Sequence, residues 1–94
     1  MNKYELLFIL DPELEEEART SYIERIKGII DEAGELEAVD EWGSRKLAYE
    51  INKKNEGYYV KMNFKSTPEI PKELVRVFRI SEAVMRHLIV NEDE

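Results

Sequence analysis

The apolar residues of this sequence change their spacing along the chain, and the order of those changes leaves few possible folds. Residues 3–10 alternate apolar with other side chains, which predicts a strand. Residues 12–33 then carry apolar side chains at helical spacing. Asp11 suits an N-cap, Pro12 a first helical residue and Gly34 a left-handed stop. One amphipathic helix is therefore expected after the first strand.

The next part of the chain returns to strand periodicity. Residues 36–51 are predicted to form a long strand whose phase slips between residues 39 and 43, as a β-bulge would cause, with Gly43 as the kink. Residues 52–57 have the composition of a turn, and residues 58–65 alternate again. The two strands are thus expected to form a β-hairpin.

A second helix and a last strand complete the pattern. Thr67 and Pro68 open a short helix, although Pro71 leaves its first turn undecided, and residues 84–90 form a strand. The order strand, helix, strand, strand, helix, strand predicts an α+β ferredoxin-like split βαβ fold, in which a four-stranded antiparallel sheet carries two helices on one face. A single domain over residues 1–94 is expected, because a chain this short supports one core. The side chains expected in that core are Tyr4, Leu6, Phe8, Ile26, Ile30, Val60, Met62, Phe64, Leu74, Phe78 and Val84.

The sheet face away from the helices is expected to be open. Leu7 and Ile9 alternate with the core residues of the first strand and so lie on that face. Tyr59, Lys61, and Tyr49 or its neighbours are expected there from the hairpin. A solvent-facing surface with aromatic and aliphatic side chains beside lysines is typical of a surface for a partner.

Residue types needed for catalysis or metal binding are sparse. The chain has no cysteine, which excludes disulfides and thiolate metal sites. The sole histidine, His87, lies in an apolar strand and is expected to be an ordinary half-buried side chain. The serines have no adjacent base, and no glycine-rich phosphate-binding motif occurs. We expect no enzyme, no cofactor, no metal site and no small-molecule substrate.

The apolar runs are too short to enter a membrane. Residues 6–10 form such a run, but a charged residue and a proline follow it at once. A cytoplasmic protein without a membrane partner is the default expectation.

Charge is unevenly distributed along the chain. The formal net charge is −7, yet residues 43–65 carry six basic and two acidic side chains. Residues 1–42, in contrast, carry four basic and thirteen acidic side chains. The cationic middle of the chain is either a solvated hairpin or a contact surface.

Inspection of the residues leaves two binding hypotheses, with a metabolite-sensing regulatory domain as a third class. The first is an autonomous RNA-recognition motif, because residues 56–62 partly match its basic-Gly-aromatic-x-aromatic signature. The match is poor, since Glu56 stands where a cation is required. Tyr58 and Tyr59 are adjacent and should point to opposite faces, so they could not stack bases side by side. The second hypothesis is a protein that binds RNA only within a larger assembly.

Several motifs resemble one family over nearly the whole chain. The most specific is the Gly-x-basic-x-Leu-Ala-Tyr-x-Ile pattern of residues 43–51. The others are Tyr4-Glu5, Asp11-Pro12, Trp42-Gly43 and Gly57-Tyr58. On these residues the sequence resembles bacterial small-subunit ribosomal protein six. The resemblance implies a ferredoxin-like fold and a structural, non-catalytic role. It also implies a heterodimer with the small basic ribosomal protein eighteen on the central domain of the small-subunit ribosomal RNA.

The resemblance implies that the cationic residues of segment 43–65 contact RNA or a protein partner. Arg45 and Lys46 would contact phosphates or hold a protein partner in register, although charges on an exposed strand also discourage edge pairing. The residues expected to contact RNA are Lys3, Arg45, Lys46, Lys53, Lys54, Arg79 and Arg86. Those expected at the interface with the partner protein are Leu47, Ala48, Tyr49, Tyr59 and Lys61.

Overall fold

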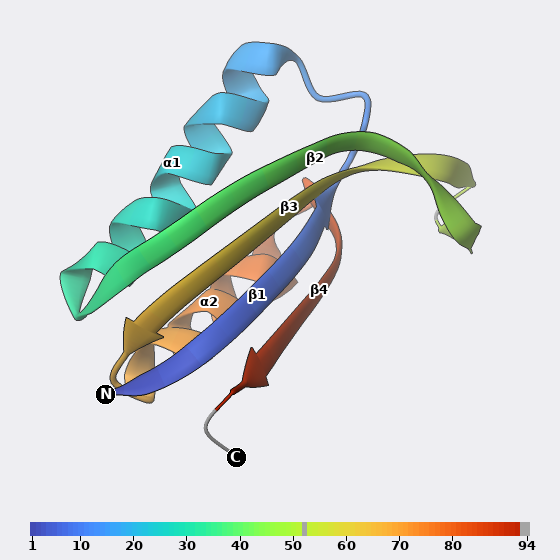
Figure 1. Ribbon diagram of the computed structural model, residues 1–94. Coiled ribbons are helices and arrows are strands. Elements are labelled where there is room, and N and C mark those ends of the chain that lie inside the picture. The colour runs from blue at the N-terminus through green and yellow to red at the C-terminus, as the bar shows by residue number, and fades with distance from the viewer. Residues whose placement is uncertain (52, 93–94) are drawn as a thin grey trace.

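The computed structural model describes residues 1–51 and 53–92 and contains four strands and two helices (Figure 1). In chain order these are β1 (Asn2–Leu10), α1 (Glu16–Glu32), β2 (Gly34–Ile51), β3 (Lys54–Ser66), α2 (Glu69–Ile80) and β4 (Val84–Asn91). The strands form one antiparallel sheet in the order β2-β3-β1-β4. In Figure 1 α2 lies behind the sheet and α1 lies beyond its β2 edge, so neither helix covers the face toward the viewer. The predicted ferredoxin-like α+β fold is confirmed.

The core lies between the sheet and the two helices. Alternation along β1 and β3 sends every second side chain to this side, as the sequence predicted. Phe8 packs against Phe78 of α2, with 5.3 Å between ring centroids, and Tyr4 stacks on Phe64. Every predicted core residue is buried except Val84, which is half-buried at the start of the edge strand β4.

Helix α1 begins later than the sequence predicted. It starts at Glu16, and Asp11 is not its N-cap; the N-cap position is Glu15, which makes no side-chain capping bond. The Asp11 side chain instead accepts the backbone N–H of Glu13 at 2.9 Å, within the turn that follows β1. Pro12 therefore belongs to this turn and not to the helix.

Gly34 has a different role from the one predicted. Among the described residues, a positive φ occurs at Gly43 (82°) and Lys53 (66°), so Gly34 is not a left-handed helix stop. It opens β2 at a close approach between chain segments. A Cβ atom there would clash with the backbone oxygen of Lys65 and lie 2.7 Å from the Cβ of Ser66. Gly34 is needed for packing, not for its φ angle.

Strand β2 is irregular where its register with β3 shifts. Its register with β3 shifts between Glu41 and Gly43, which confirms the predicted kink at Gly43. Two further shifts occur, one between Leu36 and Ala38 and one between the pairs Lys46↔Glu56 and Ile51↔Lys54, where residues 47–50 lie opposite a single residue of β3. We call residues 45–51 and 53–57 the hairpin arm, because β2 and β3 there extend past Tyr58, the last residue of β3 that pairs with β1 (Figure 1).

The predicted turn of the hairpin is too long. Residues 54–57 belong to β3, because Lys54 already pairs with Ile51. Lys53 lies in the turn with a left-handed φ, whereas Asn52, part of the same prediction, lies outside the described residues. The two strands of the arm therefore pair again at Ile51 and Lys54, after the irregular residues 47–50.

Helix α2 and strand β4 agree closely with the sequence. The helix buries Ile70, Leu74, Val77 and Phe78 against the sheet. Pro71 is accommodated because the first-turn N–H groups of a helix have no partner within it. Neither helix within residues 1–51 and 53–92 has both the length and the hydropathy of a membrane-spanning segment.

Candidate protein and nucleic-acid interface

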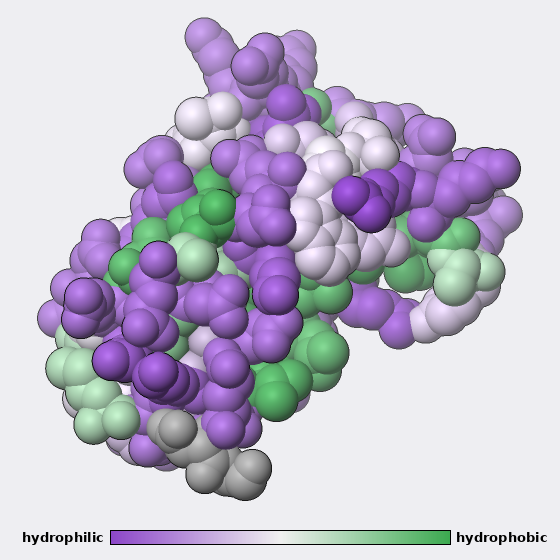
Figure 2. Space-filling view, in the orientation of Figure 1, coloured by the Kyte–Doolittle hydropathy of each residue, from purple (hydrophilic) through white to green (hydrophobic). Residues whose placement is uncertain are grey.

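The open face of the sheet carries apolar side chains beside cations. The strand registers place Leu7 beside Leu88 and Lys61, and Ile9 beside Tyr59 and Arg86. Leu88 is 58% exposed on this face. Figure 2, from the same side as Figure 1, shows green apolar side chains among purple hydrophilic ones on this face. The face has the mixed character expected of a surface for a partner.

The hairpin arm bends over this face and encloses a groove. The groove has a volume of about 250 Å³ and is lined by Leu7, Ile9, Leu47, Ala48, Tyr49, Ile51, Tyr59 and Arg86. A second hollow of about 440 Å³ adjoins it and shares Leu7, Ile9 and Arg86. Four of the five residues predicted at the partner interface, all except Lys61, thus lie around one groove.

Gly57 allows the arm to come close to the sheet. A Cβ atom on Gly57 would clash with the Ile9 side chain and lie 3.4 Å from Leu47 Cδ2. At the far side of the groove, the Arg86 guanidinium of β4 lies over the Tyr49 ring, 5.0 Å from its centroid. These contacts hold the arm across the sheet from β1 to the edge strand β4.

A stack of three side chains lies at the base of the arm. The Trp42 indole stacks on Tyr59, with ring centroids 6.0 Å apart and an interplanar angle of 14°. Its Nε1–H donates to Asp40 Oδ2 at 3.0 Å. The Arg45 guanidinium lies over the same indole, 5.2 Å from its centroid. The stack orders a cation beside the apolar groove.

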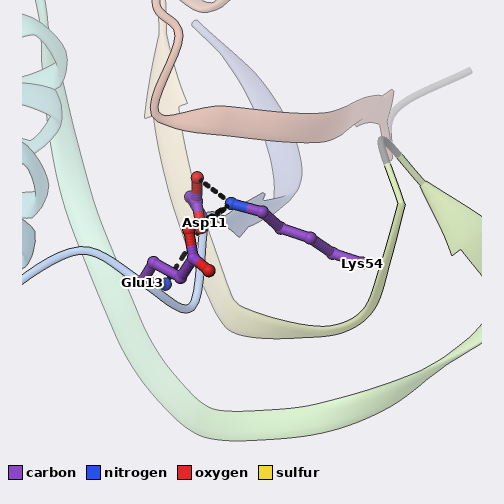
Figure 3. Close-up of polar contacts among 3 residues, drawn as sticks. All are labelled: Asp11, Glu13 and Lys54. Carbon is purple, nitrogen blue, oxygen red and sulfur yellow. Dashed lines mark hydrogen bonds and ion pairs between the residues drawn. The ribbon is translucent and has the colours of Figure 1, made fainter.

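Lys54 is engaged in an ion cluster rather than free for RNA (Figure 3). Its Nζ lies 2.6 Å from Asp11 Oδ2 and 2.9 Å from Glu13 Oε2. The hydrogen bond from Lys54 holds the pKa of Asp11 below its ordinary value, and the two carboxylates raise the pKa of Lys54. We infer that Lys54 fastens the turn after β1 to the hairpin arm.

We expect Asp11→Asn to lower the thermal unfolding midpoint near pH 7 by a few degrees, because it removes the charge that Lys54 binds. The lowered pKa of Asp11 means that this stabilisation is present above pH 3.8 and is lost as the pH falls below that value. The difference between wild type and variant should therefore shrink toward pH 3. Circular dichroism melts across this range measure it, with the more exposed Glu13→Gln as a milder control. A difference that does not change with pH would mean that the charge of Asp11 is unimportant.

The other predicted cations are dispersed. Lys61 pairs with Glu5 at 3.1 Å on the open face. Lys46 and Lys53 are exposed on the arm, and Lys3 is exposed on β1. Arg79 lies on α2, on the helical side of the sheet.

His87 is half-buried, as predicted. Its ring stacks on Phe78, with 5.2 Å between centroids. Burial, with a contribution from the charge of Arg79, lowers the pKa of His87 below its ordinary value. Residues 1–51 and 53–92 hold no cluster of side chains suited to a metal ion.

Tyr58 and Tyr59 lie on opposite faces of the sheet, as the sequence predicted. Tyr58 points to the helical side, where its hydroxyl donates to Glu41 at 2.9 Å and Arg19 lies over its ring. Burial and the negative charge of Glu41 raise the pKa of Tyr58. Tyr59 alone reaches the open face, where Trp42 stacks on it. The paired stacking platform of an RNA-recognition motif is not formed by these two residues.

Sequence reasoning missed three residues of this surface. The sequence identified Trp42 only as part of a family motif. Because of the bulge at Gly43, residue spacing does not tell which face of the sheet the indole occupies. Leu88 and Val90 are 58% and 46% exposed on β4. Their alternation with His87 and Ile89 is a readable signal for an apolar outer face.

Comparison with known proteins agrees with this fold. The family model of ribosomal protein S6 matches residues 3–91. Small ribosomal subunit protein bS6 of Clostridium novyi (strain NT) is 59% identical, and that of Alkaliphilus metalliredigens (strain QYMF) 56% identical, each over 100% of both chains. The crystal structure of 30S ribosomal protein S6 from Thermotoga maritima matches with a TM-score of 0.92 and 35% identity, over 98% of this chain and 88% of that chain. The chain belongs to the ribosomal protein S6 family.

Proposed function

We propose that this protein binds the central domain of the small-subunit ribosomal RNA together with the basic ribosomal protein eighteen, as a heterodimer. Its family consists of structural components of the ribosome and not of enzymes, which supports the expected non-catalytic role. Its relatives are named as proteins of the small ribosomal subunit. The same role would place the protein in the cytoplasm.

The observation that carries this proposal is the apolar groove beside the cations of the hairpin arm. The groove offers a protein partner aromatic and aliphatic contacts from Leu47, Tyr49 and Tyr59. Beside it, Arg45 and Lys46 make no ion pair within residues 1–51 and 53–92. One surface can thus contact a protein and a phosphate backbone together.

Electrostatics explains why a partner would be needed. A chain of net charge −7 is repelled by RNA at long range, so local cations alone give weak binding. A basic partner seated in the groove would reverse the sign of the complex near the arm. Lys54, neutralised by Asp11 and Glu13, is not included in the proposed RNA surface.

We expect the chain alone to show no binding to a central-domain RNA fragment at micromolar concentration, whereas an equimolar mixture with the basic partner binds it. Filter binding or gel-shift titrations over a series of salt concentrations measure this. Replacing Arg45 and Lys46 with Ala in the heterodimer should reduce the salt slope by roughly one unit for each phosphate that these side chains contact.

An autonomous RNA-recognition motif makes the opposite prediction. It would bind single-stranded RNA alone and with sequence preference, because each stacked base contributes about 1–3 kcal/mol. The separation of Tyr58 from Tyr59 by the sheet argues against this alternative. Tight, sequence-specific binding by the isolated chain would replace the heterodimer proposal with it.

A further inference from the structure

We propose that Arg45 binds an RNA phosphate through a guanidinium group that Trp42 holds in position. Arg45 is the contact residue in this proposal, and Trp42 is a positioning residue that need not touch RNA. The proposal rests on the proposed RNA-binding function and assigns one side chain of the arm to RNA rather than to the protein partner.

The backbone of β2 places Trp42 where it can act in this way. Glu41 pairs with Val60 and Gly43 pairs with Tyr59, so Trp42 is the extra residue of a bulge. Gly43 has a φ of 82°, a conformation that glycine adopts without strain. The bulge keeps the indole on the open face, against Tyr59, and lets the strand continue toward Arg45.

The indole is fixed by two separate contacts. The Tyr59 ring stacks on it at 6.0 Å, and Asp40 accepts its Nε1–H at 3.0 Å. A ring held by stacking and by a hydrogen bond has little rotational freedom left. It therefore presents a defined surface to the Arg45 guanidinium, 5.2 Å from the ring centroid.

A guanidinium against an aromatic ring has the geometry for phosphate recognition. The cation–π contact uses no N–H group as a hydrogen-bond donor to an acceptor atom, so the guanidinium can still donate two parallel hydrogen bonds to an anion. Arg45 is exposed and has no carboxylate partner within residues 1–51 and 53–92. Lys61 and Lys54, in contrast, are already paired with acids. Because the proposed partner is basic, phosphate is the favoured anion.

The test is a double-mutant cycle in the heterodimer, read as affinity for the central-domain RNA fragment at several salt concentrations. Arg45→Ala should lower the salt slope by about one unit. Trp42→Leu should weaken binding by roughly two- to five-fold, the strength of an exposed cation–π contact, and leave the slope unchanged because the charge remains. In the Arg45→Ala background, Trp42→Leu should have no further effect.

Two conservative variants and a remote control complete the test. Trp42→Phe keeps an aromatic face and should recover most of the affinity, which also guards against a folding defect in Trp42→Leu. Arg45→Lys keeps the charge but not the planar fork, so it should lose affinity and keep the slope. Lys72→Ala, at an exposed position of α2, should change neither the RNA affinity nor the salt slope.

The outcomes separate the two proposals. An unchanged slope in Arg45→Ala, with weaker binding to the partner protein, would place the guanidinium against protein and overturn the phosphate assignment. An equal loss of affinity from Trp42→Leu in both backgrounds would overturn the role of Trp42. Absence of RNA binding by the wild-type heterodimer would overturn the proposed function, and this inference with it.

Discussion

Gly34→Ala is expected to destabilise the protein by on the order of 3 kcal/mol, a large part of the stability of a domain this size. The added Cβ would clash with the backbone oxygen of Lys65 and lie 2.7 Å from the Cβ of Ser66. Both neighbours belong to the paired strand β3, so neither can move away without breaking the ladder. Urea unfolding followed by circular dichroism measures the decrease in stability.

Gly28→Ala is the matched control, because it makes the same chemical change on α1. Gly28 is exposed, and a Cβ there would meet no atom within 4 Å. Alanine in a helix is favoured over glycine by about 0.5–1 kcal/mol, so this variant should be more stable than wild type. If Gly34→Ala were also neutral or stabilising, the close approach of β2 and β3 would not be the reason for glycine at that position.

Gly34 also shows what residue spacing can and cannot predict. The change from helical to strand periodicity after residue 33 predicts a break at the correct place, and Gly34 does stand there. The predicted cause is wrong, because a left-handed cap and a close contact both require glycine and differ only in three dimensions. Periodicity reports which side chains are buried, and it carries little information about how the chain leaves one element for the next.

Part of the candidate site could also be predicted from the sequence, and part could not. The proximity of Leu47, Ala48, Tyr49 and Tyr59 follows from their family motif and from alternation in β3, and all four line the groove. The engagement of Lys54 could not be predicted, because its partner Asp11 lies 43 positions away in the chain. A lysine on an exposed strand has the same sequence signature whether its charge is free or paired.

Bulges in β2 explain why the position of Trp42 was missed. Each bulge shifts the alternation of β2 by an amount that the sequence does not reveal, so the face occupied by Trp42 could not be derived from residue spacing. Once the register with β3 is known, the same spacing becomes informative. The bulge opposite Tyr59 and the register shift at residues 47–50 then explain how β2 supplies both the cation Arg45 and the apolar lining of the groove.

The second large effect concerns the groove, which Tyr49 lines, and the adjoining hollow, which Leu88 lines. We expect Tyr49→Asp and Leu88→Asp each to weaken association with the basic ribosomal partner by about 100-fold or more, as removal of a central anchor residue does. Both side chains are more than half exposed in the free protein, at 57% and 58%. Burying them therefore contributes hydrophobic free energy to association and not to folding. A carboxylate at either position would have to be desolvated on binding, and its attraction to a basic partner would mainly raise the association rate.

The free protein should tolerate both changes. Neither side chain belongs to the core, and an aspartate at position 49 could pair with Arg86, which already lies against the Tyr49 ring. Unfolding midpoints should therefore stay close to wild type. Tyr59 is a less suitable test position, since it supports the Trp42 stack and its removal would disturb the fold of the arm.

A control on the helical side tests whether the loss of partner binding is specific to the open face. Ile80→Asp replaces an apolar side chain that is 67% exposed at the end of α2, behind the sheet, and should not affect partner binding. Tyr49→Phe keeps the ring and should bind as wild type does. Calorimetric titration of the purified partner into each variant compares them directly. If Tyr49→Asp and Leu88→Asp both bind at full affinity, the partner does not cover the groove; if Ile80→Asp alone fails, the interface lies on the helical face.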